Sequence, residues 1–518
     1  MAVTGAVGPI EYPPQEFEGQ ESEENPVSEE QSACGALAES CEQSRGSRFL
    51  NAGRHQTILL GHSDQSKMIA SISGPHKDDA RVSNSVPDGA RSAKDTMSVG
   101  GSEPARTGAS GMRILFLSPR LCAPQVTGAR LREYHLARAL GGHAEVTYVS
   151  FLPAGLEPPS PADLPFFSEI HVTPLVERNN PLNIMRGLVG GWPLPVLNYT
   201  SAKMKATLAS IAARQRFDLV HIDSFVMAAY APFLGSVLPG PVRVAYDWHN
   251  IGSELMRRMA SSMSSIPRKV YARITASRLG SMERRMLRSG FGHVVCSERE
   301  REQFIGMEPG ARIAVIENGV DPERFASSHS VDRRQRLLFV GTMNYSPNSE
   351  AAIRFARRVW PRIRERFPGL RLTIVGSNPG PAVLALRDQP GVEVTGTVPE
   401  VAPFYREAFA AVVPLRTGGG TRLKILEAMA AGVPVLSTSL GAEGLAVSPG
   451  KDILIVDDDE GWVRALIGLS ESERSCDDLA AAGRDLVRSR YDWRVLGERL
   501  YETYRQWLAS VVESSAAR

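Results

Sequence analysis

From Arg113 onward, short β-branched and apolar runs alternate with helical segments, and this alternation constrains the fold more than any other feature of the chain. Such alternation is typical of parallel sheets whose strands are joined by crossover helices. Several runs are continuously apolar, as expected for strands covered on both faces. The predicted strands are Arg113–Ser118, Glu145–Ser150, Leu219–Asp223, Val242–Asp247, His293–Cys296, Arg336–Val340, Arg371–Val375, Val392–Thr395, Ala411–Pro414, Pro434–Ser437 and Ile453–Val456.

The strands fall into two sets, separated by the turn-forming stretch Glu317–Pro322. We therefore expect two α/β domains and a final helix that begins near Trp493, whose apolar residues follow helical spacing. The expected segments are an N-terminal tail (1–111), a first Rossmann-like domain (112–316), a hinge (317–330), a second Rossmann-like domain (331–492), a C-terminal helix (493–510) and a short tail (511–518).

Residues 1–110 differ in composition from the rest of the chain. They carry 9 basic and 16 acidic residues, against 50 basic and 41 acidic residues in the remainder, and only three of the 35 aromatic residues. Such a segment buries too little apolar surface to offset its ordering entropy, so we predict a disordered acidic and polar tail. It lacks the pattern of a signal peptide. Met112 is an alternative initiation site, and residues 1–111 are predicted to be dispensable.

Two further features bear on where the protein works. The chain has no uninterrupted apolar run of 18 residues, so no transmembrane helix is predicted. Its five cysteines are scattered without metal-ligand spacing, which favours a reducing cytoplasm in which Cys122 and Cys296 are core thiols.

The most informative stretch of the sequence runs from Gly418 to Thr438. A strand ends at Pro414, and three glycines then precede a helix. A glycine-rich loop lets backbone N–H groups approach an anion, and a helix N-terminus adds partial positive charge. The residues that form this predicted phosphate cradle are the glycines Gly419 and Gly420, Thr421 as the helix cap, and the cations Arg422 and Lys424.

Glu427 strengthens this prediction because it is the only ionisable residue between Lys424 and Glu443. Burying an unpaired carboxylate costs several kcal/mol, so the side chain is expected to meet a ligand hydroxyl or a fixed cation. A ribose diol fits best, because one carboxylate accepts two hydroxyl hydrogen bonds. A structural ion pair with a basic neighbour is the alternative.

Several further segments of the chain are informative when they are taken together and in order. They are Met-Arg-Ile-Leu-Phe-Leu-Ser (112–118), Gly-Ala-Arg-Leu-Arg-Glu-Tyr-His (128–135), Val-Val-Cys-Ser-Glu (294–298), Glu-Asn-Gly-Val-Asp (317–321), Leu-Thr-Ile-Val-Gly (372–376), Val-Thr-Gly-Thr-Val (394–398), the glycine-rich helix, and Gly-Ala-Glu-Gly-Leu (441–445). With these segments, the chain from Met112 to about Leu508 resembles the retaining glycosyltransferases of family 4, which have the GT-B fold. Within that family it is most similar to bacterial sugar transferases of exosortase and exopolysaccharide systems.

The resemblance implies two Rossmann-like domains that face a cleft, a nucleotide-sugar held mainly by the second, and a last helix that crosses back onto the first. Glu427 then matches the second acid of the family's E-x7-E motif, the one that binds ribose. Gly419 stands where the first acid is expected. The chain also lacks the family's diphosphate-binding Arg and Lys, since it has Gly-Thr-Met-Asn-Tyr-Ser-Pro-Asn at 341–348. We expect Arg422 and Lys424 to bind the diphosphate instead. The alternative is that both are solvated residues of the helix.

Three further site residues follow from the resemblance. His249, in Tyr-Asp-Trp-His-Asn (246–250), resembles a cleft histidine that touches the donor sugar, and a structural histidine is the alternative. Gly128 corresponds to the glycine loop beside the acceptor and diphosphate, or to an ordinary turn between a strand and a helix. Glu443 lies where the family often places a polar contact to the donor.

Mechanistically, the resemblance implies that the diphosphate leaves with cationic and amide support while the acceptor hydroxyl attacks from the same face. No metal and no cofactor is expected. Asp457 and Asp459 spell a D-x-D, but they open a helix and are predicted to form an acidic capping turn.

The predicted function is transfer of a sugar from a nucleotide-diphosphate sugar to a glycan or lipid-linked acceptor with retention, in cell-surface or exopolysaccharide biosynthesis. Two alternatives remain open: a nucleotide-sugar epimerase of the same fold, and a catalytically silent scaffold. Residues 256–288 carry nine basic residues and one acid, which suits contact with an anionic membrane at the cytoplasmic face or, alternatively, a solvated surface. Nucleic-acid binding is not expected, because no recognition motif is present.

Overall fold

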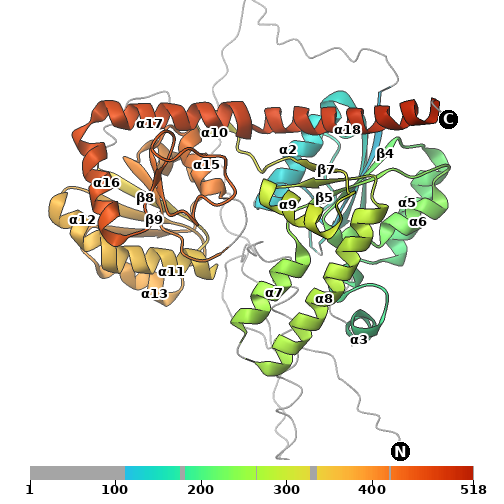
Figure 1. The fold of residues 1–518 in the computed structure, drawn as a ribbon, viewed down its shortest axis with the longest axis horizontal. Coiled ribbons are helices and arrows are strands. Elements are labelled where there is room, and N and C mark those ends of the chain that lie inside the picture. The colour runs from blue at the N-terminus through green and yellow to red at the C-terminus, as the bar shows by residue number, and fades with distance from the viewer. Residues whose placement is uncertain are drawn as a thin grey trace, which may run out of the picture. The chain divides into compact units, whose positions relative to one another are not determined.

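The computed structural model describes residues 111–125, 127–153, 155–175, 181–263, 265–326, 335–418 and 422–516. The N-terminal tail predicted from composition therefore lies, up to residue 110, outside the described residues. The described chain contains two parallel sheets, each covered by helices (Figure 1).

The first sheet has seven parallel strands in the order β3-β2-β1-β4-β5-β6-β7. Its strands are β1 (Arg113–Ser118), β2 (Glu145–Leu152), β3 (Glu169–Pro174), β4 (Leu219–Asp223), β5 (Val244–Trp248), β6 (Gly292–Val295) and β7 (Ile313–Val315). Its helices are α2 (Gly128–His143), α3 (Pro181–Val189), α4 (Leu194–Leu197), α5 (Ala202–Arg214), α6 (Tyr230–Val237), α7 (Gly252–Ser262), α8 (Ile266–Ser289) and α9 (Glu298–Met307).

The second sheet has six parallel strands in the order β10-β9-β8-β11-β12-β13. Its strands are β8 (Arg336–Val340), β9 (Arg371–Val375), β10 (Val392–Gly396), β11 (Ala410–Val413), β12 (Val435–Ser437) and β13 (Leu454–Ile455). The helices that follow β7 are α10 (Pro322–Phe325), α11 (Ser346–Arg354), α12 (Trp360–Arg366), α13 (Pro381–Leu384), α14 (Ala402–Arg406), α15 (Leu423–Ala430), α16 (Asp459–Glu471), α17 (Glu473–Leu486) and α18 (Trp493–Ala516).

The alternation of side chains along β1 shows how the first sheet is buried on both faces. Ile114 and Phe116 pack into one apolar cluster, and Leu115 and Leu117 into another on the opposite face. Helix α18 covers the first of these faces, because Trp493, Leu496, Leu500 and Tyr504 belong to the same cluster as Ile114. The stripe predicted from helical spacing therefore packs against the first sheet. A separate apolar core is built around β8 to β12.

The observed fold confirms the predicted class, because two parallel-sheet α/β domains are present. All eleven predicted strands exist, with ends that shift by at most two residues. The sequence analysis missed β3 and β7, which form the two edges of the first sheet. Cys122 and Cys296 are free and buried. In the described part of the chain, no helix has both the length and the apolar character that a membrane crossing requires.

Candidate active site

The order of the strands in each sheet is enough to locate the candidate site, without reference to side chains. In each sheet the chain first builds outward on one side and then reverses, next to β1 in the first sheet and next to β8 in the second. Ligands of open α/β sheets bind beyond the carboxyl ends of the strands at such a switch point. The relevant loops are those that follow β1 and β4, and those that follow β8 and β11.

The loop after β11 leads into α15, the helix for which the sequence predicts a phosphate cradle. Gly418 has a φ of 100°, a conformation that favours glycine. Gly419, Gly420 and Thr421 lie outside the described residues. Arg422 occupies the N-cap position, and its side chain forms no capping hydrogen bond. The predicted capping role of Thr421 therefore falls outside the described residues and stays a prediction.

Arg422 is buried rather than solvated. Its Nη2 donates to the carbonyl oxygens of Gly418 and Leu440 at 3.3 and 3.2 Å, which ties the start of α15 to the loop after β12. Burial lowers the pKa of the guanidinium, while nearby Tyr345 and Glu443 act in the opposite direction. The side chain is thus held in place at the end of the glycine-rich loop.

Lys424 reaches the loop that follows β8. Its Nζ donates to Oδ1 of Asn348 at 2.7 Å and lies 4.9 Å from the ring centroid of Phe339. A Cβ atom at Gly341 would lie 2.7 Å from the same Nζ, so the amine rests against the turn directly after β8. Burial and the charge of Arg422 lower the pKa of Lys424 to about 7. A cation from α15 therefore lies beside the segment 341–348, in which the sequence has no cation.

Glu427 lies one turn further along α15 and accepts a hydrogen bond from a tyrosine. The Tyr405 hydroxyl donates to Oε2 of Glu427 at 3.0 Å. Burial raises the pKa of Glu427, while this hydrogen bond and the charge of Lys424 act against the rise. Among the described residues, no cation forms an ion pair with this carboxylate. The alternative of a structural ion pair is therefore not what the structure shows.

Glu443 lies in the loop after β12 and is exposed. Its charge influences the pKa of Arg422, which places the carboxylate in the electrostatic surroundings of the same helix start. The loop is shaped by Gly441, where a Cβ would lie 2.3 Å from Ser437 Oγ and 2.7 Å from Val413 O. A glycine is required there for the loop to approach β11 and β12 this closely.

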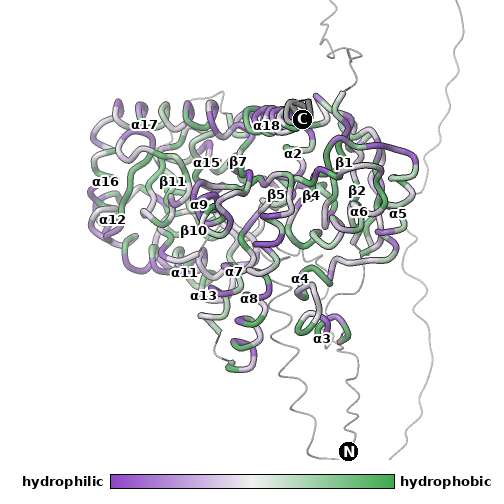
Figure 2. Tube along the Cα trace, turned by 45° about the vertical axis from the view of Figure 1, so that its right-hand side comes forward, coloured by the Kyte–Doolittle hydropathy of each residue, from purple (hydrophilic) through white to green (hydrophobic). Residues whose placement is uncertain are grey.

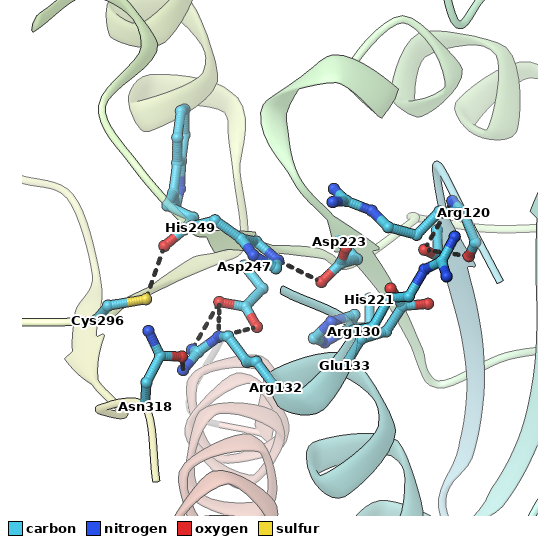
Figure 3. Close-up of polar contacts among 12 residues, drawn as sticks. Arg120, Arg130, Arg132, Glu133, His221, Asp223, Asp247, His249, Cys296 and Asn318 are labelled. Carbon is cyan, nitrogen blue, oxygen red and sulfur yellow. Dashed lines mark hydrogen bonds and ion pairs between the residues drawn. The ribbon is translucent and has the colours of Figure 1, made fainter. Parts of the chain in front are cut away.

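In the first sheet, His249 is paired with an aspartate that the sequence analysis did not select. His249 Nε2 lies 2.7 Å from Asp223 Oδ1, at the carboxyl end of β4 (Figure 3). Burial lowers the pKa of His249, but the Asp223 charge and hydrogen bond raise it more, so the net shift is upward. For Asp223, burial raises the pKa and the charge of His249 lowers it, with a net downward shift. The pair therefore favours the charged forms of both residues.

Arg132 and Asp247 form a buried ion pair next to this dyad (Figure 3). Arg132 Nη2 lies 2.8 Å from Asp247 Oδ1, and both side chains are fully buried. Arg132 Nη1 donates to the carbonyl oxygens of Ile316 and Glu317 at 2.8 and 3.1 Å. The arginine of α2 thus connects the end of β5 to the segment after β7. This fixes the backbone from which His249 projects.

His221, Asp223 and Asp247 bring three metal-ligand side chains close together. One atom of each is already engaged: His221 Nδ1 lies 2.7 Å from the Tyr504 hydroxyl, Asp223 Oδ1 pairs with His249, and Asp247 pairs with Arg132. His221 Nε2 and Asp223 Oδ2 are buried without a hydrogen-bond partner among the described residues. The Arg132 charge lies within the group, which opposes binding of a second cation. These residues are a poor fit to a metal centre.

The acids of the D-x-D segment at 457–459 are also held by contacts within the chain. Asp458, between its two acids, caps α16, and Asp459 pairs with Arg354.

Gly128 is the first residue of α2, and the Thr127 side chain caps that helix by accepting from Arg130 N at 3.1 Å. A Cβ at Gly128 would lie 3.4 Å from Leu423 Cδ1, at the start of α15. The glycine is therefore next to the helix that carries Lys424 and Glu427.

The sequence analysis did not select three residues of the site: Asp223, Arg132 and Tyr405. For Asp223 a signal existed, because it is the last residue of a predicted apolar strand and so lies at the carboxyl edge of the sheet.

Comparisons with known proteins agree with this arrangement. A family model described as "Glycosyltransferase Family 4" matches residues 127–324, and one described as "Glycosyl transferases group 1" matches residues 334–472. Glycogen synthase of Mycobacterium tuberculosis is 24% identical over 411 residues, which cover 76% of this chain and 94% of that protein. The protein is a glycosyltransferase with the GT-B fold.

Solved structures support the fold of this glycosyltransferase. Sucrose-phosphate synthase from Thermosynechococcus elongatus matches with a TM-score of 0.56 at 17% identity, covering 77% of this chain and 100% of that one. The Anabaena protein HepE in complex with UDP and glucose matches with a TM-score of 0.52 at 14% identity, covering 76% and 99%. Both likenesses bear on the fold alone.

Proposed function

We propose that this glycosyltransferase moves a sugar from a nucleotide-diphosphate sugar to a glycan or lipid-linked acceptor, with retention of configuration and without a metal. Its role would be in cell-surface or exopolysaccharide biosynthesis at the cytoplasmic face of the membrane. The observation that carries the donor assignment is the pair of side chains on α15. Lys424 offers a cation at the end of β8, and Glu427 offers a carboxylate one turn away.

The two side chains suit the two polar parts of such a donor. A diphosphate needs cationic and N–H donors, and Lys424 lies at the switch point where an anion would meet the start of α15. A ribose diol needs an acceptor, and Tyr405 engages Oε2 of Glu427 from one side. HepE, with a similar fold, has been crystallised with UDP and glucose, which supports a nucleotide-sugar donor here.

The chemical step would rest on positioning and charge stabilisation. Lys424 and Arg422 would stabilise charge on the leaving diphosphate, together with the backbone N–H groups of Gly420 and Thr421. His249, oriented by Asp223, would contact the donor sugar, with Gly128 on the acceptor side and Glu443 as a further polar contact to the donor. Asp223 is a positioning residue in this scheme.

The donor assignment is tested by thermal stabilisation with a panel of nucleoside diphosphates, followed by assays of sugar transfer. We expect one nucleotide to stabilise the protein, and Lys424→Ala and Glu427→Gln each to weaken that binding about tenfold or more, as loss of a charged hydrogen bond does. Lys451→Ala, which changes an exposed lysine of the same domain, is the matched control and should bind as the wild type does.

NMR of the product shows whether the configuration of the transferred sugar is retained. Transfer that continues in the presence of a metal chelator supports the mechanism without a metal. If no nucleotide stabilises the chain, the scaffold alternative replaces this proposal. Equal binding by wild type, Lys424→Ala and Glu427→Gln would show that α15 does not hold the donor.

A further inference from the structure

Exposed apolar side chains are concentrated on two neighbouring helices of the first domain. Of the nine large hydrophobic residues that are exposed in the described part of the chain, seven lie on α3 and the first half of α8. Val189 is 84% exposed and Ile266 is 74% exposed. We call this set the α3–α8 face: Leu182, Met185, Leu188, Val189, Ile266, Val270 and Ile274. Figure 2 shows hydrophobic colour on both helices.

The residues of the α3–α8 face form one surface because arginines of α8 hold the end of α3. Arg278 Nη1 donates to Leu188 O at 2.8 Å, and Arg285 Nη2 donates to Gly191 O at 3.0 Å. Ile266, Val270 and Ile274 are spaced four residues apart and thus share the side of α8 that leads to Arg278. The stripe on α8 therefore continues onto α3.

The face is set among basic side chains. From Gly252 to Ser289 the chain has nine basic and two acidic residues. Both acids are engaged locally: Glu283 accepts from Ser253 N at 2.8 Å, and Glu254 pairs with Arg299 and Arg258. Arg186 adds an exposed cation on α3. Arg258 and Arg288 are themselves paired, with Glu254 and Glu308, and the remaining cations leave this stretch with a net positive charge that an anionic partner can contact.

The residue composition of the α3–α8 face indicates whether its partner is a lipid surface or another protein. The centres of protein interfaces are depleted in charged residues and lysine is rare in them, although methionine and arginine are enriched there along with aromatic residues. Every member of the α3–α8 face is aliphatic or methionine, and Lys269 and Arg273 lie within its α8 stripe. Aliphatic residues beside Lys and Arg are typical of helices that lie in the interface of an anionic bilayer.

We propose that the α3–α8 face docks this glycosyltransferase onto an anionic lipid bilayer, with its aliphatic side chains at the boundary between headgroups and acyl chains. This goes beyond the nine-residue basic patch predicted from sequence, because it assigns the apolar part of the contact. It also stands independently of the donor and of whether the acceptor is a lipid.

Co-sedimentation of the full chain with vesicles tests the proposal, using phosphatidylcholine alone and phosphatidylcholine mixed with phosphatidylglycerol. We expect binding to the mixed vesicles that weakens at high salt. The double variant Val189→Asp/Ile266→Asp should reduce binding at least about tenfold, and Lys269→Ala and Arg273→Ala should each reduce it about fivefold. Leu384→Asp, which changes an exposed leucine of the second domain, is the matched control and should bind as the wild type does.

Each variant is also measured for nucleotide-induced stabilisation, which reports folding and donor binding separately from membrane docking. Wild-type protein that does not bind the mixed vesicles would overturn the proposal, as would a double variant that binds equally well. Sedimentation velocity in vesicle-free buffer covers a third outcome: a dimer that the double variant abolishes would assign the face to a second copy of the chain and overturn lipid docking.

Discussion

The surroundings of Lys424 lower the pKa of its amine into the range where enzymes work. Its amine is enclosed between Phe339, Asn348 and the turn at Gly341, and burial with the charge of Arg422 lowers its pKa to about 7. A lysine in water carries its charge up to about pH 10. Here the charge is poised to be lost near neutrality unless an anion binds.

The lowered pKa of Lys424 predicts that kcat/KM for the donor falls as pH rises. As pH rises through about 7, Lys424 of the free enzyme loses its charge, so kcat/KM for the donor is expected to fall. Lys424→Arg keeps its charge throughout this range and is expected to remove this part of the fall. Steady-state kinetics between pH 6 and 9, with Lys451→Ala as the control, measure the effect. A wild-type profile that is flat, or one that Lys424→Arg reproduces, would contradict this role.

At the scale of elements, α18 contributes to the first domain as one of its covering helices. Trp493, Leu496 and Leu500 are buried against the face of the sheet that includes Ile114, and Trp493 stacks on His135 with ring centroids 5.2 Å apart. The Tyr504 hydroxyl lies 2.7 Å from Nδ1 of the buried His221, which stands on β4 two residues before Asp223. A helix at the end of the sequence thereby supports the site in the first domain.

Tyr504→Phe tests this support. The variant keeps the ring but leaves Nδ1 of a buried imidazole without its partner, which should cost about 1–3 kcal/mol of stability. Urea denaturation followed by fluorescence and circular dichroism measures the change. Tyr501→Phe is the control, because the Tyr501 ring stacks on the exposed His143 with ring centroids 4.6 Å apart and is only half-buried. Equal stabilities for the two variants would argue against the buried hydrogen bond.

At the scale of the whole molecule, the described apolar cores are built from residue 114 onward. The charge difference along the chain follows the same division, with 16 acids and 9 bases before residue 111. The two sheets, α18 and every described candidate site residue lie after Met112.

A chain that begins at Met112 is therefore expected to keep the thermal midpoint and the nucleotide binding of the full chain. Differential scanning fluorimetry with the stabilising nucleotide makes the comparison. A chain that begins after Ser118, and so lacks β1 at the centre of the first sheet, is the control and should not fold. Failure of the Met112 chain to fold or bind would show that the preceding residues are needed.

Much of the fold could be predicted because its signals are local. The interior strands are continuous apolar runs, and the long amphipathic stripe of α18 repeats over several turns, so both are recognisable within a short window. The edge strands β3 and β7 were missed because they are only partly buried and carry no such run. Glu427 was also recognisable locally, as a single carboxylate within an apolar helix.

The sequence by itself determined the two parallel-sheet domains, the glycine-rich loop and the candidate residues on α15. Only the tertiary structure decided which side chains meet: Lys424 with Asn348, Asp223 with His249, and Arg132 with Asp247. It also decided that α3 and α8 share one exposed apolar face. The physical reason is that periodicity is set by neighbours in the chain, whereas these contacts depend on which strands and helices become adjacent after folding.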